Sequence, residues 1–153
     1  MQLVYSSNKT CVISSLAMLT DLHFDTVMED LMPKMEYPFE PPWETYPKVP
    51  SMDTICDWLW QRFGRSLTPF NKNPHCTPNM ACKAVPVWYN GEEKWLSQLQ
   101  YGKGLLEGVY NGFIGHMCAW DSERVFDPRG FVYTWENRAE YKFDAERFWL
   151  WQG

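Results

Sequence analysis

The apolar positions near the start of the chain recur with a helical period. Val12, Leu16 and Leu19 fall on one face of the segment over residues 11–20, as the inner face of an amphipathic helix does. Thr10 stands just before that segment, at the position where a helix N-cap belongs. The pattern therefore predicts a helix that begins directly after Thr10.

Three further helices are predicted from signals of the same kind. Asp25 is expected to cap a short second helix, and Ser51 to cap a longer helix over residues 52–63. Gly64 follows that longer helix, at the position where glycine commonly ends helices in the left-handed conformation. A last short helix is predicted over residues 92–100. Most of the helical signal thus lies in the first half of the chain.

The second half has the pattern of short strands separated by turn residues. Asn111-Gly112 is a strong hairpin turn signal, and the segment 127–130 (Asp-Pro-Arg-Gly) ends a later strand. Strands are predicted over residues 1–5, 66–70, 84–89, 104–110, 114–120, 124–126 and 148–151, with a helical turn over 136–141. Helices followed by hairpins predict an α+β fold with N-terminal helices packed on a C-terminal antiparallel sheet.

A proline-rich loop over residues 33–50 interrupts this order. It contains six prolines, and aromatic residues such as Trp43 lie among them. A flexible linker would consist of Gly, Ser and charged residues. Because aromatic side chains anchor a loop, this one is expected to pack on the body of the protein beside a functional site.

Length and composition indicate a single domain. Residues 1–153 fall within the usual size of one domain, and 45% of them are apolar. A domain of this length buries roughly 70% of its unfolded surface, so its core needs no disulfide or metal. The nine tryptophans are expected to fill that core and to line a concave binding surface.

Charge and cysteine usage narrow the function classes. The net charge of −5 argues against nucleic acid and against an anionic membrane surface as partners, so a peptide or protein partner fits better. The sequence contains no apolar run of transmembrane length and no secretory pattern. Five cysteines, an odd number, suggest free thiols in a reducing compartment. These features predict a cytoplasmic protein and leave its oligomeric state open.

Three residues carry the candidate chemistry. Cys11 stands at the start of the predicted first helix, where backbone N–H groups and the helix dipole favour the thiolate. His116 lies at the entrance of one predicted strand, and Asp127 ends the next antiparallel strand. A carboxylate in that position reaches the imidazole and fixes its tautomer, which is the arrangement that an activated cysteine requires.

The segments around these residues resemble a known family. They are residues 10–20 (Thr-Cys-Val-Ile-Ser-Ser-Leu-Ala-Met-Leu-Thr), 115–121 (Gly-His-Met-Cys-Ala-Trp-Asp) and 125–128 (Val-Phe-Asp-Pro). Together they are similar to the peptidase C39-like branch of the papain-like superfamily, especially its small stand-alone bacterial and bacteriophage members. The resemblance covers both ends of the chain and not residues 33–103.

The resemblance implies a role for each of the three residues. Cys11 would be the nucleophile, His116 the general base and acid, and Asp127 the residue that orients the imidazole. The family commonly has a Gln about six residues before the cysteine as an oxyanion donor. Here that stretch is residues 5–10 (Tyr-Ser-Ser-Asn-Lys-Thr), in which Asn8 is the candidate replacement.

Other candidate sites are weaker. His75, Cys76 and Cys82 lie close together in sequence, but two of them are adjacent and there is no CxxC pair, so no metal site and no cofactor are predicted. Cys118 shares a strand face with His116 and is expected to pack in the sheet, where a second thiol near the site could be redox-sensitive. Candidates for the wall of a substrate groove are Trp43, Trp88 and Trp120.

The predicted function is a cysteine hydrolase, peptidase-like or amidase-like, that acts on an amide or acyl bond. An acyl transfer would use the same residues. The chief alternative is a catalytically weak or inactive papain-like fold that binds and modulates a partner protein. Such a modulator could be phage-encoded and act in the host cytoplasm. A third reading is an α+β domain in which Cys11, His116 and Asp127 never meet.

Overall fold

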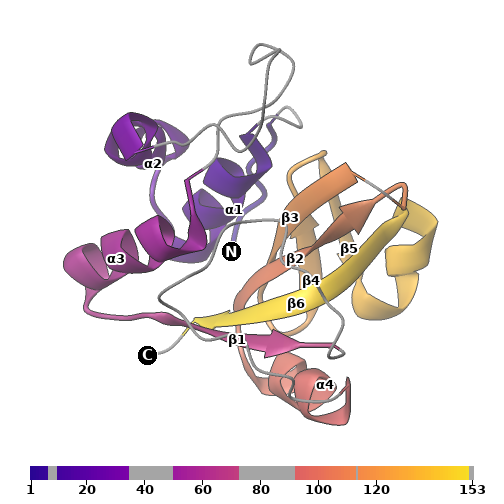
Figure 1. Ribbon diagram of the computed structural model, residues 1–153. Coiled ribbons are helices and arrows are strands. Elements are labelled where there is room, and N and C mark those ends of the chain that lie inside the picture. The colour runs from indigo at the N-terminus through magenta and orange to yellow at the C-terminus, as the bar shows by residue number, and fades with distance from the viewer. Residues whose placement is uncertain (7–9, 35–49, 73–91, 113, 152–153) are drawn as a thin grey trace.

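The computed structural model describes residues 1–6, 10–34, 50–72, 92–112 and 114–151. The helices are α1 (Cys11–Thr20), α2 (Phe24–Leu31), α3 (Met52–Phe63) and α4 (Glu92–Tyr101), with short 3-10 helices η2 (Met32–Lys34) and η3 (Trp135–Tyr141). The strands are β1 (Leu67–Asn71), β2 (Gly104–Tyr110), β3 (Ile114–Trp120), β4 (Arg124–Asp127), β5 (Phe131–Thr134) and β6 (Phe143–Trp151). Helices α1, α2 and α3 lie together beside the sheet, which confirms the predicted α+β class (Figure 1).

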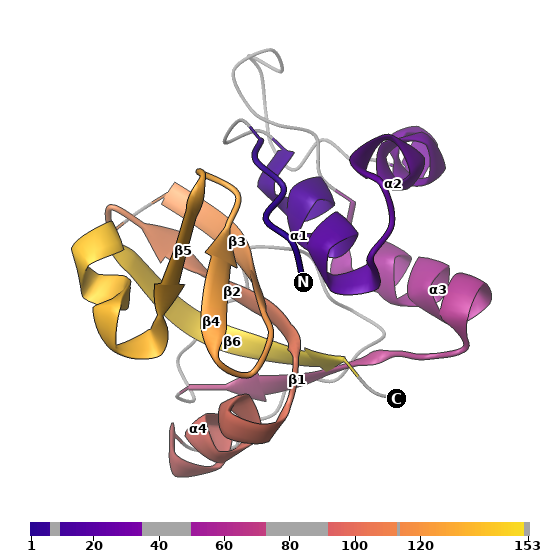
Figure 2. The ribbon, with the colours of Figure 1, turned by 180° about the vertical axis from the view of Figure 1, so that it is seen from behind.

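The six strands form one antiparallel sheet in the order β1-β6-β2-β3-β4-β5. Strands β2 to β5 are consecutive neighbours, whereas β6 returns to lie between β1 and β2 (Figures 1 and 2). The β2–β3 hairpin turns at Asn111 and Gly112, whose φ angles of 55° and 84° are those that an Asn-Gly turn favours. This hairpin places His116 opposite Gly108.

The capping residues set the helix ends. Ser51 accepts a hydrogen bond at Oγ from the backbone N–H of Thr54, and Gly64 closes α3 with a φ of 66°, both as predicted. The prediction for α2 was wrong by two residues. His23, and not Asp25, occupies the N-cap, and its Nδ1 accepts from the backbone N–H of Asp25.

Two other sequence expectations need correction. Residues 1–5 do not form a strand; the segment leads instead to Ser6, whose N–H donates to the carbonyl of Pro128 at 2.9 Å. Strand β5 was not predicted, because the sequence over Phe131–Thr134 shows no clean alternation, and β6 begins at Phe143 rather than at residue 148. The predicted helix at 92–100 and turn at 136–141 correspond to α4 and η3.

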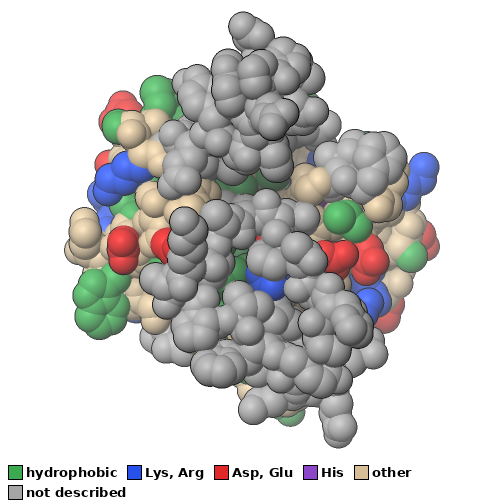
Figure 3. Space-filling view, in the orientation of Figure 1, with side chains coloured by type: hydrophobic (Ala, Val, Ile, Leu, Met, Phe, Trp, Pro, Cys, Tyr) green, Lys and Arg blue, Asp and Glu red, His purple; other side chains and the backbone are tan. Residues whose placement is uncertain are grey.

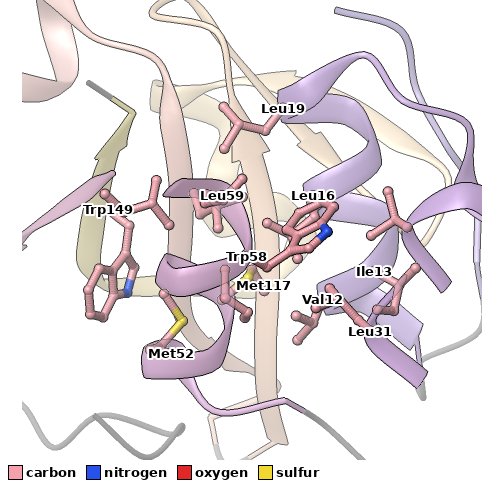
Figure 4. Close-up of a cluster of buried hydrophobic side chains, with 14 of the residues drawn as sticks. Val12, Ile13, Leu16, Leu19, Leu31, Met52, Trp58, Leu59, Met117 and Trp149 are labelled. Carbon is pink, nitrogen blue, oxygen red and sulfur yellow. The ribbon is translucent and has the colours of Figure 1, made fainter. Parts of the chain in front are cut away.

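The larger core cluster lies between the three N-terminal helices and one face of the sheet (Figure 4). Helix α1 is almost entirely buried, and nine of its ten residues are in the buried class. The residues of this cluster that are labelled in Figure 4 come from α1, α2, α3, β3 and β6. They are Val12, Ile13, Leu16, Leu19, Leu31, Met52, Trp58, Leu59, Met117 and Trp149. The indole N–H of Trp58 donates to Oδ2 of Asp30 on α2 at 2.9 Å. Trp60, on the other side of α3, is exposed.

A second cluster covers the opposite face of the sheet. It includes Leu106, Cys118, Trp120, Phe148 and, from α4, Leu99. The sheet is therefore apolar on both faces, which explains why its central strands are buried along most of their length. On the described surface in Figure 3, acidic and basic side chains are interspersed along both flanks.

Candidate functional site

Cys11 is the first residue of α1 and is 8% exposed. The side chain of Thr10 makes no capping hydrogen bond, although its backbone occupies the predicted N-cap position. Helix α1 is held against β3 by Ser15, whose Oγ donates to the carbonyl of Met117 at 3.0 Å. Because this bond lies one turn after Cys11 and one residue after His116, it brings the helix start close to the imidazole.

His116 sits on β3 where the neighbouring strand has a glycine. A Cβ at Gly108 would collide with the carbonyl oxygen of Asp144, so only glycine lets β2 and β6 approach at the level of the histidine. The imidazole packs edge-on against Phe143, with ring centroids 5.7 Å apart, and beside Tyr110 at 6.0 Å. His116 is 4% exposed. The ring is thus fixed by packing before any polar contact is considered.

Asp127 is the last residue of β4 and meets His116 directly. Its Oδ1 lies 2.8 Å from Nε2 of the imidazole, and the carboxylate is completely buried. The β3–β4 pairing, in which Ala119 faces Phe126, sets this contact. Since Nε2 is engaged by Asp127, Nδ1 is the ring nitrogen that remains for a thiol.

Two thiols interact with the imidazole. Cys11 and Cys118 both lie close enough to His116 to raise the pKa of its imidazole. Cys118 lies on β3 and is fully buried in the second core cluster, whereas Cys11 is the first residue of α1. The structure therefore places Cys11 beside the His116–Asp127 pair.

Burial and charge shift the protonation equilibria of this cluster. Burial alone lowers the pKa of His116, but the hydrogen bonds with Asp127 and then with Cys11 and Cys118 outweigh it and raise that pKa far above 6.5. Burial alone raises the pKa of Asp127, but the hydrogen bonds from His116 and Arg129 hold it well below its usual value of 3.8. Burial raises the pKa of the Cys118 thiol to about 12. The cluster therefore favours an ionised Asp127, a proton on His116 and a neutral Cys118.

Two residues that the sequence did not single out complete the surroundings of Asp127. Arg129 donates from its backbone N–H, Nε and Nη2, and its shortest contact is 2.6 Å from Nη2 to Oδ2. Tyr133 donates from its hydroxyl to Oδ2 at 2.8 Å. A buried carboxylate requires such partners, and an arginine two residues beyond Asp127 was the available sequence signal.

One group in the described residues has the donor atoms of a metal site. Ligand atoms of His116, Cys118 and Asp127 all lie within 4.8 Å of one another, and nitrogen, sulfur and oxygen donors suit zinc. However, both oxygens of Asp127 already accept hydrogen bonds, and Arg129 places a cation against them. A metal ion would have to displace these partners. The predicted loop group of His75, Cys76 and Cys82 lies outside the described residues.

The remaining predicted site residues fall into two sets. Trp120 is 4% exposed and its indole N–H donates to the carbonyl of Leu99 at 2.7 Å, so it packs in the core and does not form a groove wall. Asn8, Trp43 and Trp88 lie outside the described residues, as does most of the proline-rich loop.

A shallow depression of about 510 Å³ lies beside the cluster rather than over it. Its lining residues are Asn111, Gly112, Arg138, Ala139, Lys142, Phe143 and Asp144. Phe143 connects this depression to the candidate site, because its ring also packs against the ring of His116. None of the three candidate catalytic residues lines this depression.

No family model matches the chain, and no curated protein or solved structure matches it significantly. Within the described part of the chain, no single helix has the length and apolar character needed to cross a membrane. The segments Cys11–Thr20 and Phe24–Lys34 reach that length only as a pair bent by 119°.

Proposed function

We propose that the chain is a cysteine hydrolase of the papain-like, peptidase C39-like type, which cleaves an amide or related acyl bond in a cytoplasmic peptide or protein. The observation that carries this proposal is the shared imidazole of His116. One ring nitrogen is 2.8 Å from Asp127, and the thiol of Cys11 lies close enough to the same ring to raise its pKa. Nucleophile, base and orienting group are the parts that acyl transfer needs.

Acylation begins with transfer of the Cys11 thiol proton to Nδ1 of His116. The raised pKa of His116 favours this transfer. The sulfur then attacks the substrate carbonyl carbon and forms a tetrahedral oxyanion. As the C–N bond breaks, the proton on Nδ1 passes to the leaving amine, and a thioester at Cys11 remains.

Deacylation reverses the proton path with water as the nucleophile. Nδ1 of His116 takes a proton from the water as its oxygen attacks the thioester carbon. The C–S bond breaks, the acid product leaves, and the thiol of Cys11 recovers its proton from the imidazolium. Asp127 stays ionised throughout, keeps the Nε2–H directed toward itself and stabilises the imidazolium.

The start of α1 supplies the groups that would stabilise the oxyanion. The first backbone N–H groups of a helix have no partner within the helix, and they point out of its N-terminus beside Cys11. An anion there is also favoured by the helix dipole. The arrangement of a buried helix that begins at the cysteine and packs on the histidine strand supports the papain-like assignment.

The deciding experiment is the pH dependence of iodoacetamide alkylation at Cys11, compared between wild type and His116→Ala. In the wild type we expect labelling near neutral pH to be fast. In His116→Ala we expect the rate to fall by roughly 10² or more, because the base that accepts the thiol proton is absent. Slow labelling with the same pH profile in both proteins would contradict a Cys–His pair.

The chain contains its own reference thiols for this measurement. Tryptic peptides 10–34, 49–62 and 104–124 each carry one cysteine, so Cys11, Cys56 and Cys118 can be read separately by mass spectrometry. Cys56 is about as buried as Cys11 and belongs to the same core cluster, but it lies on α3 and is remote from His116 in the chain. Its labelling should stay slow and unchanged in His116→Ala.

The burial of the site favours one second function, that of a papain-like fold that binds and modulates a partner protein. Cys11 is 8% exposed and His116 4%, so little of either side chain is open to a substrate carbonyl. If Cys11 labels slowly in the wild type, peptide hydrolysis is ruled out for this state of the protein. Screening for binding partners with the intact chain then becomes the appropriate test.

A further inference from the structure

Asp127 is held far more tightly than contact with a histidine requires. Besides the bond with His116, its carboxylate accepts hydrogen bonds from the side chain of Arg129. Nε of Arg129 donates to Oδ1 and to Oδ2, each at 3.0 Å, and Nη2 donates to Oδ2 at 2.6 Å. The backbone N–H of Arg129 donates to Oδ1 at 3.0 Å, and the Tyr133 hydroxyl to Oδ2 at 2.8 Å. These bonds fix both the position and the rotation of the carboxyl plane.

The two oxygens of Asp127 have different partners, and this difference determines which oxygen faces the imidazole of His116. Oδ2 is occupied by Nη2 of Arg129 and by the Tyr133 hydroxyl, whereas Oδ1 faces Nε2 of His116. A guanidinium that donates from two nitrogens can hold a carboxylate in one orientation, which a point charge cannot do. Rotation of the carboxyl group would break several charge-assisted hydrogen bonds at once.

Arg129 is itself anchored at sites unconnected with the carboxylate. Its Nη2 also donates to the carbonyl of Tyr141 at 2.7 Å, and its guanidinium lies 4.2 Å from the ring centroid of Tyr110. Tyr110 in turn packs beside His116. The contacts therefore close a ring through His116, Asp127, Arg129 and Tyr110, in which the arginine supports both partners of the imidazole.

We propose that Arg129 is a positioning residue of the site, which holds Asp127 so that Oδ1 receives the Nε2–H of His116 and Nδ1 is presented to Cys11. This role rests on the proposed function, because it matters for catalysis only if Cys11 uses that nitrogen. Arg129 also offsets part of the negative charge of Asp127, and so limits how strongly the imidazolium is stabilised.

The test compares Arg129→Lys, Arg129→Gln and Tyr133→Phe with the wild type. Arg129→Lys retains the cation but loses the paired donors, so it separates orientation from charge. The matched control is Arg138→Gln, since Arg138 also stacks on an aromatic ring, that of Trp135 at 4.0 Å, and donates to a carbonyl, but does not contact Asp127. Each protein is followed by thermal unfolding, by the pH profile of Cys11 alkylation and by ¹H–¹⁵N spectra of the His116 ring.

We expect the hydrogen-bonded Nε2–H resonance of His116 to be lost or to shift in both Arg129 variants. Cys11 alkylation near neutral pH should slow roughly tenfold in both, with a displaced pH profile, as loss of one charge-assisted hydrogen bond implies. Tyr133→Phe should show the same change to a smaller extent, and Arg138→Gln none. A wild-type profile and ring spectrum in Arg129→Lys would overturn the orienting role.

The outcomes also separate this proposal from the function on which it rests. A lower melting temperature in the Arg129 variants with an unchanged His116 spectrum would mean that the arginine only stabilises the fold, and would refute the inference. If Cys11 is unreactive in the wild type, the hydrolase proposal fails, but the ring spectra still decide whether Arg129 orients Asp127. If Arg129→Gln does not fold, Arg129→Lys and Tyr133→Phe supply the answer.

Discussion

The Nε2 atom of His116 lies 2.8 Å from Oδ1 of Asp127, and this contact joins two neighbouring strands across 11 residues of sequence. Neither side chain is more than 2% exposed. In such a site a hydrogen bond between charged groups is strong when it is satisfied and costly when one partner is removed. The contact is therefore both a structural link within the sheet and the feature that gives the imidazole a defined tautomer.

Replacement of Asp127 by Asn should separate these two roles. The amide is nearly isosteric, but it cannot stabilise an imidazolium, and it leaves the Arg129 guanidinium without a carboxylate. We expect Cys11 alkylation near neutral pH to slow roughly 10- to 100-fold and the free energy of unfolding to fall by about 3–5 kcal/mol. Labelling kinetics and urea denaturation measure the two effects. A variant with wild-type labelling would show that Asp127 does not orient the base.

The coupling between His116 and Asp127 should depend on pH in a defined window. The pKa of His116 is raised in the folded state above 6.5, so its contribution is complete below that value and is lost as pH rises through the folded pKa. The pKa of Asp127 is lowered below 3.8, so its contribution is complete above that value and is lost as pH falls. The coupling free energy should therefore be largest between these two values.

A double-mutant cycle with His116→Gln and Asp127→Asn measures that coupling. Urea denaturation of the four proteins at a series of pH values gives the free energy of unfolding of each, and the cycle isolates the pair. We expect the coupling to decline on both sides of the window. A coupling that stays constant from acid to alkaline pH would mean that neither group changes its pKa on folding.

The sequence specified the parts of the fold that depend on local signals. The caps Ser51 and Gly64 determine the ends of α3, and Asn111-Gly112 determines the β2–β3 turn, because each acts through its own backbone conformation or hydrogen bond. Strand β5 gives no such signal. Phe131 and Val132 are exposed and only Tyr133 is buried, so the strand is defined by pairing with β4 rather than by alternation.

The three candidate catalytic residues were predictable from the sequence, whereas the residues that surround Asp127 were not. Cys11 at a helix start and His116 and Asp127 on adjacent strands could be found from spacing, and the structure brings them together. The partners of Asp127 could not be found in this way, because Tyr133 reaches it through the β4–β5 pairing that the sequence did not reveal. The prediction that Trp120 lines a groove is wrong because the sequence alone cannot distinguish a core indole from a surface one.

Cys118 should be dispensable for reactivity at Cys11. It is fully buried with a pKa raised to about 12, which keeps its thiol neutral and protected. We expect Cys118→Ala to cost about 1–2 kcal/mol in the free energy of unfolding, as small buried deletions do, and to change Cys11 labelling by no more than about threefold. Cys56→Ala, at another buried cysteine, is the matched control. Loss of Cys11 labelling only in Cys118→Ala would instead make Cys118 part of the reactive group.

Two adjacent serines in α1 offer a paired test of how the helix is held on the sheet. Ser14 and Ser15 are both completely buried, but only Ser15 has a partner in the described part of the chain, the carbonyl of Met117 at 3.0 Å. Ser15→Ala removes that bond and leaves the carbonyl with one acceptor site unfilled. We expect it to lower the free energy of unfolding by about 1–2 kcal/mol.

Ser14→Ala should have the opposite tendency. It removes a buried hydroxyl that has no hydrogen-bond partner among the described residues, and alanine is the better helix former, so stability should be unchanged or higher by up to about 1 kcal/mol. Urea denaturation of both variants measures the difference. Because α1 positions Cys11 against His116, Ser15→Ala should also slow Cys11 alkylation while Ser14→Ala does not. Equal behaviour of the two variants would mean that the Ser15 bond does not hold the helix in place.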